Sequence, residues 1–184
     1  MYVISCILFF PTLGWNLLLN RLCPSRHWWD WVDDSVLLGA LPLRRHVPEL
    51  QAAGISAVIN TCREWRGPVE AYRAAGIEEL RLPITDFTPP SLEEVRAGVA
   101  FIQRHLSAGH KVYVHCKAGR GRSATIVLCY LIAGGLSPEE GQALLRGKRR
   151  HVNRHLDRRT VVQQFARLTH HRDTEAQRTA DDER

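Results

Sequence analysis

The sequence lacks the cysteine spacing and the repeats that would assign it to a metal-binding or repeat class. Its 5 cysteines are odd in number and show no spacing typical of metal ligands. This pattern argues against a disulfide framework and favours a reducing compartment. Neither a metal ion nor an organic cofactor is therefore expected.

The chain also lacks the usual signatures of nucleic-acid binding, although it is basic. Lysine and arginine number 25 against 19 aspartates and glutamates, so the formal net charge is +6. A positive charge favours an anionic substrate or an anionic membrane surface. Nucleic acid is the competing explanation, but the basic residues are spread along the chain and no binding motif accompanies them. No nucleic-acid partner is expected.

The N-terminal segment lacks charge. Residues 2–19 carry no charged side chain and are mostly apolar. As a helix, this segment would be about 27 Å long, which is marginal for a hydrocarbon layer of about 30 Å, and Pro11, Gly14 and Asn16 weaken it. It has no basic start or small-residue cleavage site of a secretory signal. We expect residues 1–25 to be a membrane-associated segment; the alternative is an apolar helix packed on the domain.

The rest of the chain suits one compact domain, because 184 residues with 45% apolar content can bury a single core. We assign this domain to residues 26–169 and expect a polar, disordered tail at 170–184. Three tryptophans stand at the start of the domain: Trp28, Trp29 and Trp31. They either sit at a lipid headgroup boundary or cover one face of the domain.

Short apolar runs alternate with helical patterns along the domain. Strands are expected at 55–60, 79–84 and 111–115. The expected helices are 48–53, 69–75, 91–108, 137–146, 161–168 and one that begins at Arg122. Strands separated by helices predict an α/β fold with a mostly parallel central sheet flanked by helices, and its ligand crevice lies at the carboxyl ends of the strands.

The stretch between the third strand and its helix has the composition of a phosphate-binding loop. Cys116 and Arg122 bracket five residues that include two glycines, and such a loop can turn several N–H groups toward one anion. The positive end of the following helix adds to this field. The candidate phosphate-binding residues are Lys117, Ala118, Gly119, Arg120, Gly121 and Arg122.

The same field favours a thiolate, so Cys116 is the candidate nucleophile. Arg122 can present its planar fork to two phosphate oxygens. Ser123 is expected to donate a hydrogen bond to the sulfur, and His115 to orient the loop through ring hydrogen bonds. The plainer alternative is a free buried cysteine beside a surface arginine.

Asp86 opens the loop that follows the second strand, at the same edge of the sheet as Cys116. It is the candidate general acid, with a simple turn aspartate as the alternative. Glu64 and Arg66 either line the rim of the site or are solvated loop charges. Cys62 is interpreted as structural and not as a redox partner of Cys116.

A basic run covers residues 146–151 and continues with Arg154, His155, Arg158 and Arg159. It either contacts an acidic headgroup or membrane or forms a solvated helix face.

The arrangement His115-Cys116-x5-Arg122-Ser123 resembles the signature of the cysteine-dependent protein tyrosine phosphatase superfamily. The loop is also similar to those of members that act on phosphoinositides and related lipids. The resemblance implies a metal-free phosphatase with a cysteinyl-phosphate intermediate, and the place of Asp86, 30 residues before the cysteine, resembles the acid loop of the superfamily. A catalytically dead relative that binds phosphate is the competing class.

A second resemblance involves Phe9-Phe-Pro-Thr12, Trp28-Trp29-Asp30 and residues 36–43 together with the loop. These segments look like the mitochondrial protein tyrosine phosphatase-like family, whose members act as phosphatidylglycerophosphate phosphatases. The sequence departs from that family at residues 63–66 and at Leu156.

This second resemblance implies a dual-specificity-phosphatase-like fold and hydrolysis of phosphatidylglycerophosphate to phosphatidylglycerol. It also implies association with the mitochondrial inner membrane in a eukaryote, with a cytoplasmic location as the alternative. The substrate partner is then an anionic phospholipid or a phosphoprotein. The rival activities are those of a dual-specificity protein phosphatase and of a phosphoinositide phosphatase.

Overall fold

The computed structural model describes residues 11, 12, 14 and 27–170, so the segment expected at 1–25 and the tail expected at 170–184 lie almost entirely outside the described residues. The described chain forms one sheet in the order β1-β2-β5-β3-β4. Its strands are β1 Trp29–Trp31, β2 Val36–Gly39, β3 Ile55–Asn60, β4 Glu78–Arg81 and β5 Lys111–His115. Strands β2, β5, β3 and β4 are parallel, and only β1 runs antiparallel to its neighbour. The predicted mostly parallel sheet is confirmed.

The helices also follow the predicted pattern. They are the 3-10 helix η1 Arg44–His46, α2 Val47–Ala52, α3 Val69–Ala74, α4 Leu92–Ser107, α5 Arg122–Ala133 and α6 Pro138–Lys148, and residues 160–170 are helical as well. Ser91 and Ser137 both begin their helices with the expected capping boxes. Within the described ranges, no helix combines the length and the apolar character needed to cross a bilayer.

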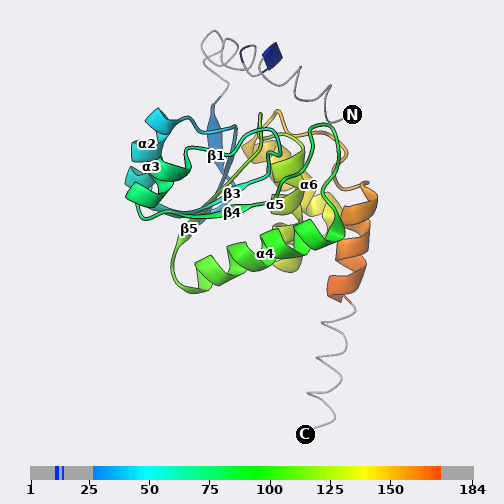
Figure 1. The fold of residues 1–184 in the computed structure, drawn as a ribbon. Coiled ribbons are helices and arrows are strands. Elements are labelled where there is room, and N and C mark those ends of the chain that lie inside the picture. Colours follow the sequence, from blue (N-terminus) through cyan, green and yellow to red (C-terminus); the bar gives the residue numbers. More distant parts are fainter. Residues whose placement is uncertain (1–10, 13, 15–26, 171–184) are drawn as a thin grey trace, which may run out of the picture.

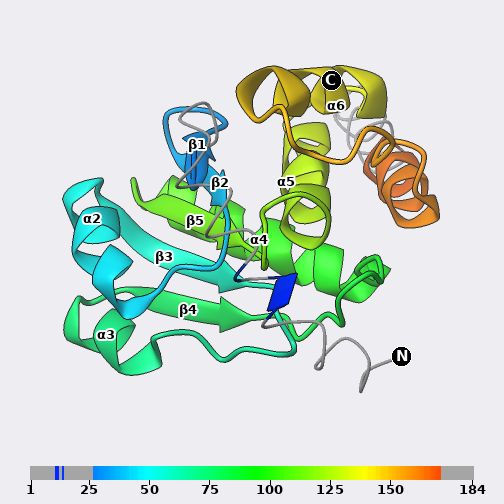
Figure 2. The same cartoon turned by 90° about the horizontal axis from the view of Figure 1, so that it is seen from above.

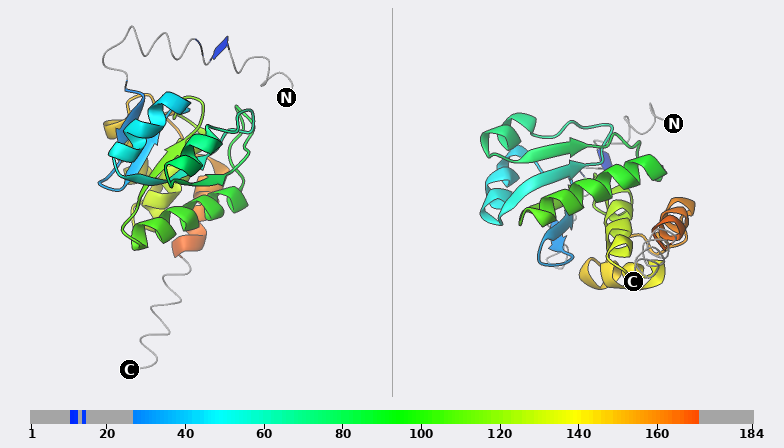
Figure 3. Two further views of the ribbon diagram at one scale, coloured as in Figure 1. Left: turned by 60° about the vertical axis from the view of Figure 1, so that its left-hand side comes forward. Right: turned by 90° about the horizontal axis from the view of Figure 1, so that it is seen from below.

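Alternation along the strands produces the layers. Val36 and Leu38 of β2 belong to the larger core beneath α4 and α5, whereas Leu37 between them belongs to a second core with residues of α2 and α3. Figures 1 and 2 show α2 and α3 on one face of the sheet and α4 and α5 on the other. Figure 3 shows α4 lying across one face of the sheet, with α6 and the last helix beyond α5.

Strand β4 is shorter than predicted. It ends at Arg81, whereas the apolar pattern suggested that it continues to Ile84. Pro83 has no N–H to donate to the ladder, which ends the strand. The chain beyond it stays attached, because the Arg63 N–H donates to the Ile84 carbonyl over 3.2 Å. The loop that carries Asp86 therefore begins earlier than the pattern suggested.

Two of the three tryptophans are built into the domain. The Trp28 Nε1–H donates to the Leu41 carbonyl at 3.1 Å, and the Trp29 ring packs edge-on against Tyr113 with centroids 5.8 Å apart. Trp31 is 36% exposed. These contacts favour the interpretation that the tryptophans cover one face of the domain. Trp29 and Trp31 lie in strand β1, which the sequence did not predict.

Candidate active site

The candidate site lies where the parallel strands end. Cys116 follows β5, and Asp86 stands in the loop after β4. Both line one pocket of about 460 Å³. Its lining residues are Thr12, Asp86, Phe87, Thr88, Cys116, Lys117, Ala118, Arg120, Gly121, Arg122, Asn153 and Arg159. The expected candidates at the carboxyl ends of the strands are therefore brought together in one hollow.

The loop from Cys116 to Arg122 is held by close backbone contacts. Gly119 has φ of 67°, and a Cβ there would lie 2.5 Å from the carbonyl carbon and oxygen of Gly39 at the end of β2. Only glycine fits both requirements. The Gly119 N–H donates to the Cys116 sulfur over 3.2 Å, so the loop turns inward as expected. Gly39, which the sequence analysis did not single out, is the matching half of this approach.

The field of the loop acts on Cys116, which is 4% exposed. Burial by itself raises the pKa of this thiol. The Arg122 charge and the donors around the sulfur, among them the N–H groups of Ser123 and Ala118, outweigh burial, so the pKa of Cys116 lies below its ordinary value. The Ser123 hydroxyl lies next to the loop, but its Oγ has no aligned hydrogen bond to any described residue. The sulfur is therefore buried among donors that favour its thiolate form.

Arg122 lies at the first turn of α5 with its guanidinium 3% exposed. Its Nη1–H groups donate to Glu64 Oε2 at 2.9 Å and to the Ile84 carbonyl at 2.7 Å. Nη2 lies 3.0 Å from Asp86 Oδ1, but it has no aligned hydrogen bond to any described residue. One fixed edge and one unsatisfied donor suit a guanidinium that receives a phosphate oxygen.

Glu64 is a supporting residue whose role the sequence left open. Its side chain is 1% exposed, and it also accepts the Asp86 N–H at 2.7 Å. Burial by itself raises the pKa of Glu64. The hydrogen bond from the Asp86 N–H and the Arg122 charge lower the pKa by more than burial raises it, so the pKa of Glu64 lies below its ordinary value. Glu64 therefore links the Arg122 guanidinium to the Asp86 loop. Arg66, by contrast, lines a separate hollow with Glu79 and Arg81.

Asp86 points into the phosphate pocket. Its carboxylate forms an ion pair with the Lys117 ammonium as well as with Arg122, and its side chain is 13% exposed. Lys117 also donates to the Thr12 hydroxyl over 2.9 Å. In this arrangement the Asp86 carboxylate is paired with Lys117 and Arg122, the two cations that an incoming phosphate would contact.

The prediction that the His115 ring orients the loop through hydrogen bonds is wrong. Neither ring nitrogen has a hydrogen-bond partner within the described part of the chain. The ring instead stacks on Tyr113 at 5.5 Å and meets Trp65 edge-on at 6.1 Å. Burial lowers the pKa of His115 to about 3, so the ring is neutral. Its own backbone carbonyl, which accepts from the Thr61 hydroxyl at 2.8 Å, anchors the start of the loop.

Arg149 supports the loop from behind, and its assignment to a headgroup-binding or solvated basic face is wrong. It is 5% exposed and donates to the carbonyls of Gly119 at 3.1 Å and Ala118 at 3.2 Å. The same guanidinium pairs with Asp30 of β1 at 2.5 Å. Since Arg149 is the only buried arginine of residues 146–151, the sequence pattern carried no signal for it.

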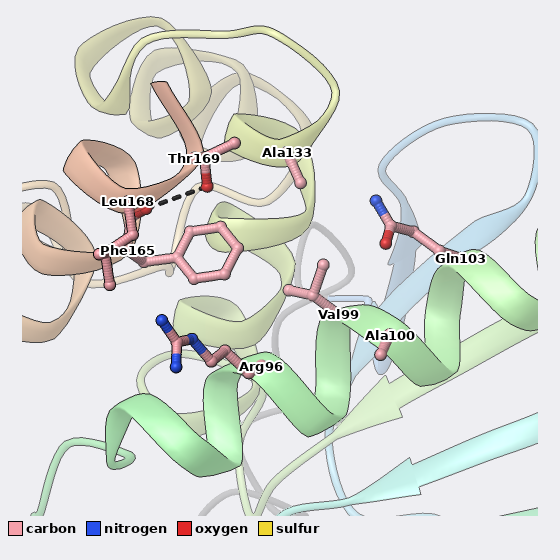
Figure 4. Close-up of a pocket in the computed structure, with 8 residues that line it drawn as sticks. All are labelled: Arg96, Val99, Ala100, Gln103, Ala133, Phe165, Leu168 and Thr169. Atoms are coloured by element: carbon pink, nitrogen blue, oxygen red, sulfur yellow. Dashed lines mark hydrogen bonds between the residues drawn. The ribbon is translucent and has the colours of Figure 1, made fainter. Parts of the chain in front are cut away.

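A second hollow lies away from the catalytic loop, between α4, the end of α5 and the last helix (Figure 4). Apolar side chains such as Val99, Phe165 and Leu168 line it together with Arg96. It contains no cysteine or carboxylate, so it offers no nucleophile or general acid for phosphate chemistry.

Comparisons with known proteins identify the family of this chain. Residues 27–182 match the family described as Swiss Army Knife protein, DSP-PTPase phosphatase domain. Phosphatidylglycerophosphate phosphatase PTPMT2 of Arabidopsis thaliana is 40% identical over 166 residues, covering 88% of this chain and 73% of that protein. Phosphatidylglycerophosphatase and protein-tyrosine phosphatase 1 of Homo sapiens is 36% identical over 169 residues, covering 86% of this chain and 84% of the relative.

A solved structure shows the same fold. The crystal structure of PTPMT1 in complex with PI(5)P superposes with a TM-score of 0.73 at 34% identity, and the match covers 80% of this chain and 99% of the other. The family match includes the loop, the acid-bearing segment and the helices around them. The chain is therefore a phosphatase that belongs to the DSP-PTPase family of cysteine-dependent phosphatases.

Proposed function

We propose that this phosphatase hydrolyses phosphatidylglycerophosphate to phosphatidylglycerol, with Cys116 as the nucleophile. The observation that carries the proposal is the buried Cys116 sulfur, which accepts the Gly119 N–H and lines one pocket with the fixed guanidinium of Arg122. The lipid substrate is supported by the relatives whose names state this activity.

In the first step, the phosphate monoester binds to the N–H groups of residues 117–122 and to the Arg122 fork. The Cys116 sulfur attacks phosphorus and the bond from phosphorus to the ester oxygen breaks. Asp86 gives its proton to that oxygen, so phosphatidylglycerol leaves with a neutral hydroxyl group and not as an alkoxide. The enzyme retains the phosphoryl group as a cysteinyl phosphate.

In the second step, water attacks the same phosphorus and the sulfur leaves as the thiolate. Asp86, now ionised, accepts the proton of the water, and inorganic phosphate is released. Ser123 stabilises the departing sulfur through its hydroxyl, in agreement with its effect on the pKa of Cys116.

Substrate binding changes the ion pairs of Asp86. An incoming phosphate competes with the carboxylate for Arg122 and Lys117, the two cations that Asp86 contacts in this structure. The phosphate and the Asp86 carboxylate are both negative and repel each other when they share these cations, so the phosphate displaces Asp86 from its ion pairs. The displaced carboxyl group is then free to approach the ester oxygen.

The proposal includes a location for the enzyme. In this proposal residues 1–25 are the membrane-associated segment and residues 26–169 the phosphatase domain. The uncharged stretch at 2–19 and the net charge of +6 both favour an anionic bilayer, and in a eukaryote this is the mitochondrial inner membrane. A cytoplasmic enzyme is the alternative.

The second candidate is a phosphatase for phosphoproteins or phosphoinositides. It is favoured by the human relative, whose name includes protein-tyrosine phosphatase, and by the relative crystallised with PI(5)P. The two candidates share the loop and the acid. They differ in the group that leaves.

The test compares turnover of a short-chain phosphatidylglycerophosphate, a phosphotyrosine peptide and PI(5)P by the full chain, with Cys116→Ser as the inactive control. The proposal expects kcat/KM on the glycerol lipid to exceed the other two by at least about tenfold. A higher kcat/KM on the peptide or on the phosphoinositide would assign the enzyme to the second candidate. Turnover by the serine variant within a thousandfold of the unmodified enzyme would exclude Cys116 as the nucleophile.

A further inference from the structure

The pocket around Cys116 contains hydrogen-bond donors beyond those of the loop, and one of them is a cation. Arg159 and Asn153 come from the segment between α6 and the last helix, and both line the pocket with Cys116. They approach the loop at Gly121. A Cβ at Gly121 would lie 3.3 Å from the Asn153 Nδ2 and 3.6 Å from the Arg159 Nη2. Two hydrogen-bond donors therefore meet at the rim of the loop.

Both residues are attached to the loop or to its helix. The Arg159 Nη1–H donates to the Thr125 hydroxyl at 2.7 Å, and that hydroxyl donates to the Gly121 carbonyl at 2.8 Å. The backbone N–H of Asn153 donates to the Arg120 carbonyl at 3.0 Å, which keeps Asn153 beside the loop. The Arg159 guanidinium is therefore held in place before any ligand arrives, which lowers the entropy lost on binding.

The charge of Arg159 differs in its surroundings from the charges of Arg122 and Lys117, which line the same pocket. Arg122 pairs with Glu64 and Asp86, and Lys117 pairs with Asp86. Arg159 is only partly exposed, yet no carboxylate of the described residues lies within 4.0 Å of its guanidinium. A partly buried cation with no carboxylate beside it favours an anion. Its hydroxyl partner Thr125 is neutral and leaves that charge in place.

The substrate class of the proposed function carries a second anion at a suitable position. Three carbons and two ester oxygens join the monoester phosphorus of phosphatidylglycerophosphate to its phosphodiester phosphorus. With the monoester in the loop, the glycerol and the diester extend from the loop toward the rim of the pocket. The diester is a monoanion with two free oxygens, which matches the planar fork of an arginine.

We propose that Arg159 and Asn153 form a second anion subsite that binds the phosphodiester of the substrate while the monoester lies in the Cys116 loop. The inference rests on the proposed function and deepens it, because it names the residues that distinguish a substrate with two phosphates from a simple monoester. Arg159 is then a specificity-determining residue, and its contribution appears in substrate binding more than in the chemical step.

The test uses two soluble substrates with the full chain. The first is glycerophosphoglycerol phosphate, the deacylated form of the lipid, and the second is glycerol 3-phosphate, which lacks the diester. Arg159→Gln should lower kcat/KM on the first by about tenfold, mainly through KM, and lower it on the second by about threefold or less. Arg159→Lys keeps the charge and loses the planar fork. Its kcat/KM on the first substrate should lie between the values of the unmodified enzyme and of Arg159→Gln. Arg158→Gln, at an exposed neighbour outside the pocket, is the matched control and should leave both within twofold.

The outcomes separate the subsite from the proposed function. An equal loss on both soluble substrates would mean that Arg159 only supports the loop, and no loss on either would remove the subsite. If Arg159→Gln does not fold, the same comparison with Arg159→Lys and Asn153→Ala decides. If the unmodified enzyme does not hydrolyse the diacyl lipid but the selective loss on the diester persists, the proposed function fails and the subsite stands.

Discussion

Cys62 and Cys116 pack in the same small cluster with Leu41, yet their thiols are shifted in opposite directions. Burial raises the pKa of Cys62. Burial has the same effect on Cys116, but there the Arg122 charge and the donors of the loop outweigh it, and the pKa falls. The difference between an inert and a reactive cysteine is therefore made by the loop and not by burial.

The first prediction follows from this contrast. Iodoacetamide reacts with the thiolate, so at pH 6.5 it should modify Cys116 at least about tenfold faster than Cys62, as measured by peptide mapping. The rate at Cys116 should rise with pH and level off with a midpoint below about 8.5, the ordinary value for a free thiol. Inorganic phosphate should protect it. In Arg122→Gln the midpoint should move upward, and an unchanged midpoint would show that Arg122 does not set it.

The loop itself could be predicted from the sequence because its information is local. The expected strand, Lys111–His115, and a helix beginning at Arg122 appear with those bounds. The glycines and the cysteine between them determine the backbone and the chemistry together. The fold class followed from the alternation of strands and helices for the same reason.

The supports of the loop could not be predicted, because they depend on contacts between distant segments. Arg149 reaches Asp30, which lies 119 residues earlier, and Glu64 reaches Arg122 across 58 residues. In the sequence, both residues are ordinary charges in polar stretches. Which charge turns inward is decided only when β1, β3 and α6 have assembled around the loop.

The second prediction tests how Arg122 is held. Arg122→Lys should lower kcat/KM, because the bidentate fit is lost. The fall should correspond to a loss of at least about 2 kcal/mol of transition-state stabilisation. Glu64→Gln keeps the shape but removes the charge that fixes the guanidinium, and we expect a loss of about tenfold. Glu70→Gln, on the exposed surface of α3, should have no effect. A Glu64→Gln enzyme as active as the control would exclude the positioning role.

The third prediction concerns Asp86. Asp86→Asn should slow hydrolysis of an alkyl phosphate by about a hundredfold or more, since the leaving alkoxide is no longer protonated. The loss should shrink with an aryl phosphate, whose leaving group needs little protonation. The neutral side chain also stops competing for Lys117 and Arg122, so inorganic phosphate should inhibit the variant at lower concentration. Equal losses on the two substrates would show that Asp86 only shapes its loop.

The fourth prediction concerns the pair of Arg149 and Asp30. Arg149→Met leaves the Asp30 carboxylate and the carbonyls behind the loop without their donor, and we expect the free energy of unfolding to fall by about 3–5 kcal/mol in urea. Adding Asp30→Leu should restore part of that loss, because both charges are then gone. Arg150→Met, at the exposed neighbour, is the control. If the double variant loses more free energy of unfolding than the two single variants lose added together, the pairing is contradicted.

The last prediction concerns the uncharged N-terminal segment. Apolar insertion and attraction between a chain of net charge +6 and anionic lipids add, so the segment and the domain together should hold the enzyme on a bilayer. Deleting residues 1–20 should release the protein from vesicles of anionic lipid in a flotation assay and slow lipid hydrolysis. Hydrolysis of a soluble aryl phosphate should change much less. This deletion also removes Thr12, whose hydroxyl accepts from Lys117 in the pocket.

Thr12→Val in the full chain separates these two effects. It removes the hydroxyl contact and keeps the apolar segment, so this variant should bind vesicles as the unmodified protein does. Any loss of aryl phosphate turnover that it shares with the deletion is then due to Lys117, and the remaining loss on lipid is due to the membrane. If the deleted protein still floats with the vesicles, or if it loses both activities to the same extent beyond the Thr12→Val variant, the segment does not act as a membrane anchor and instead supports the domain.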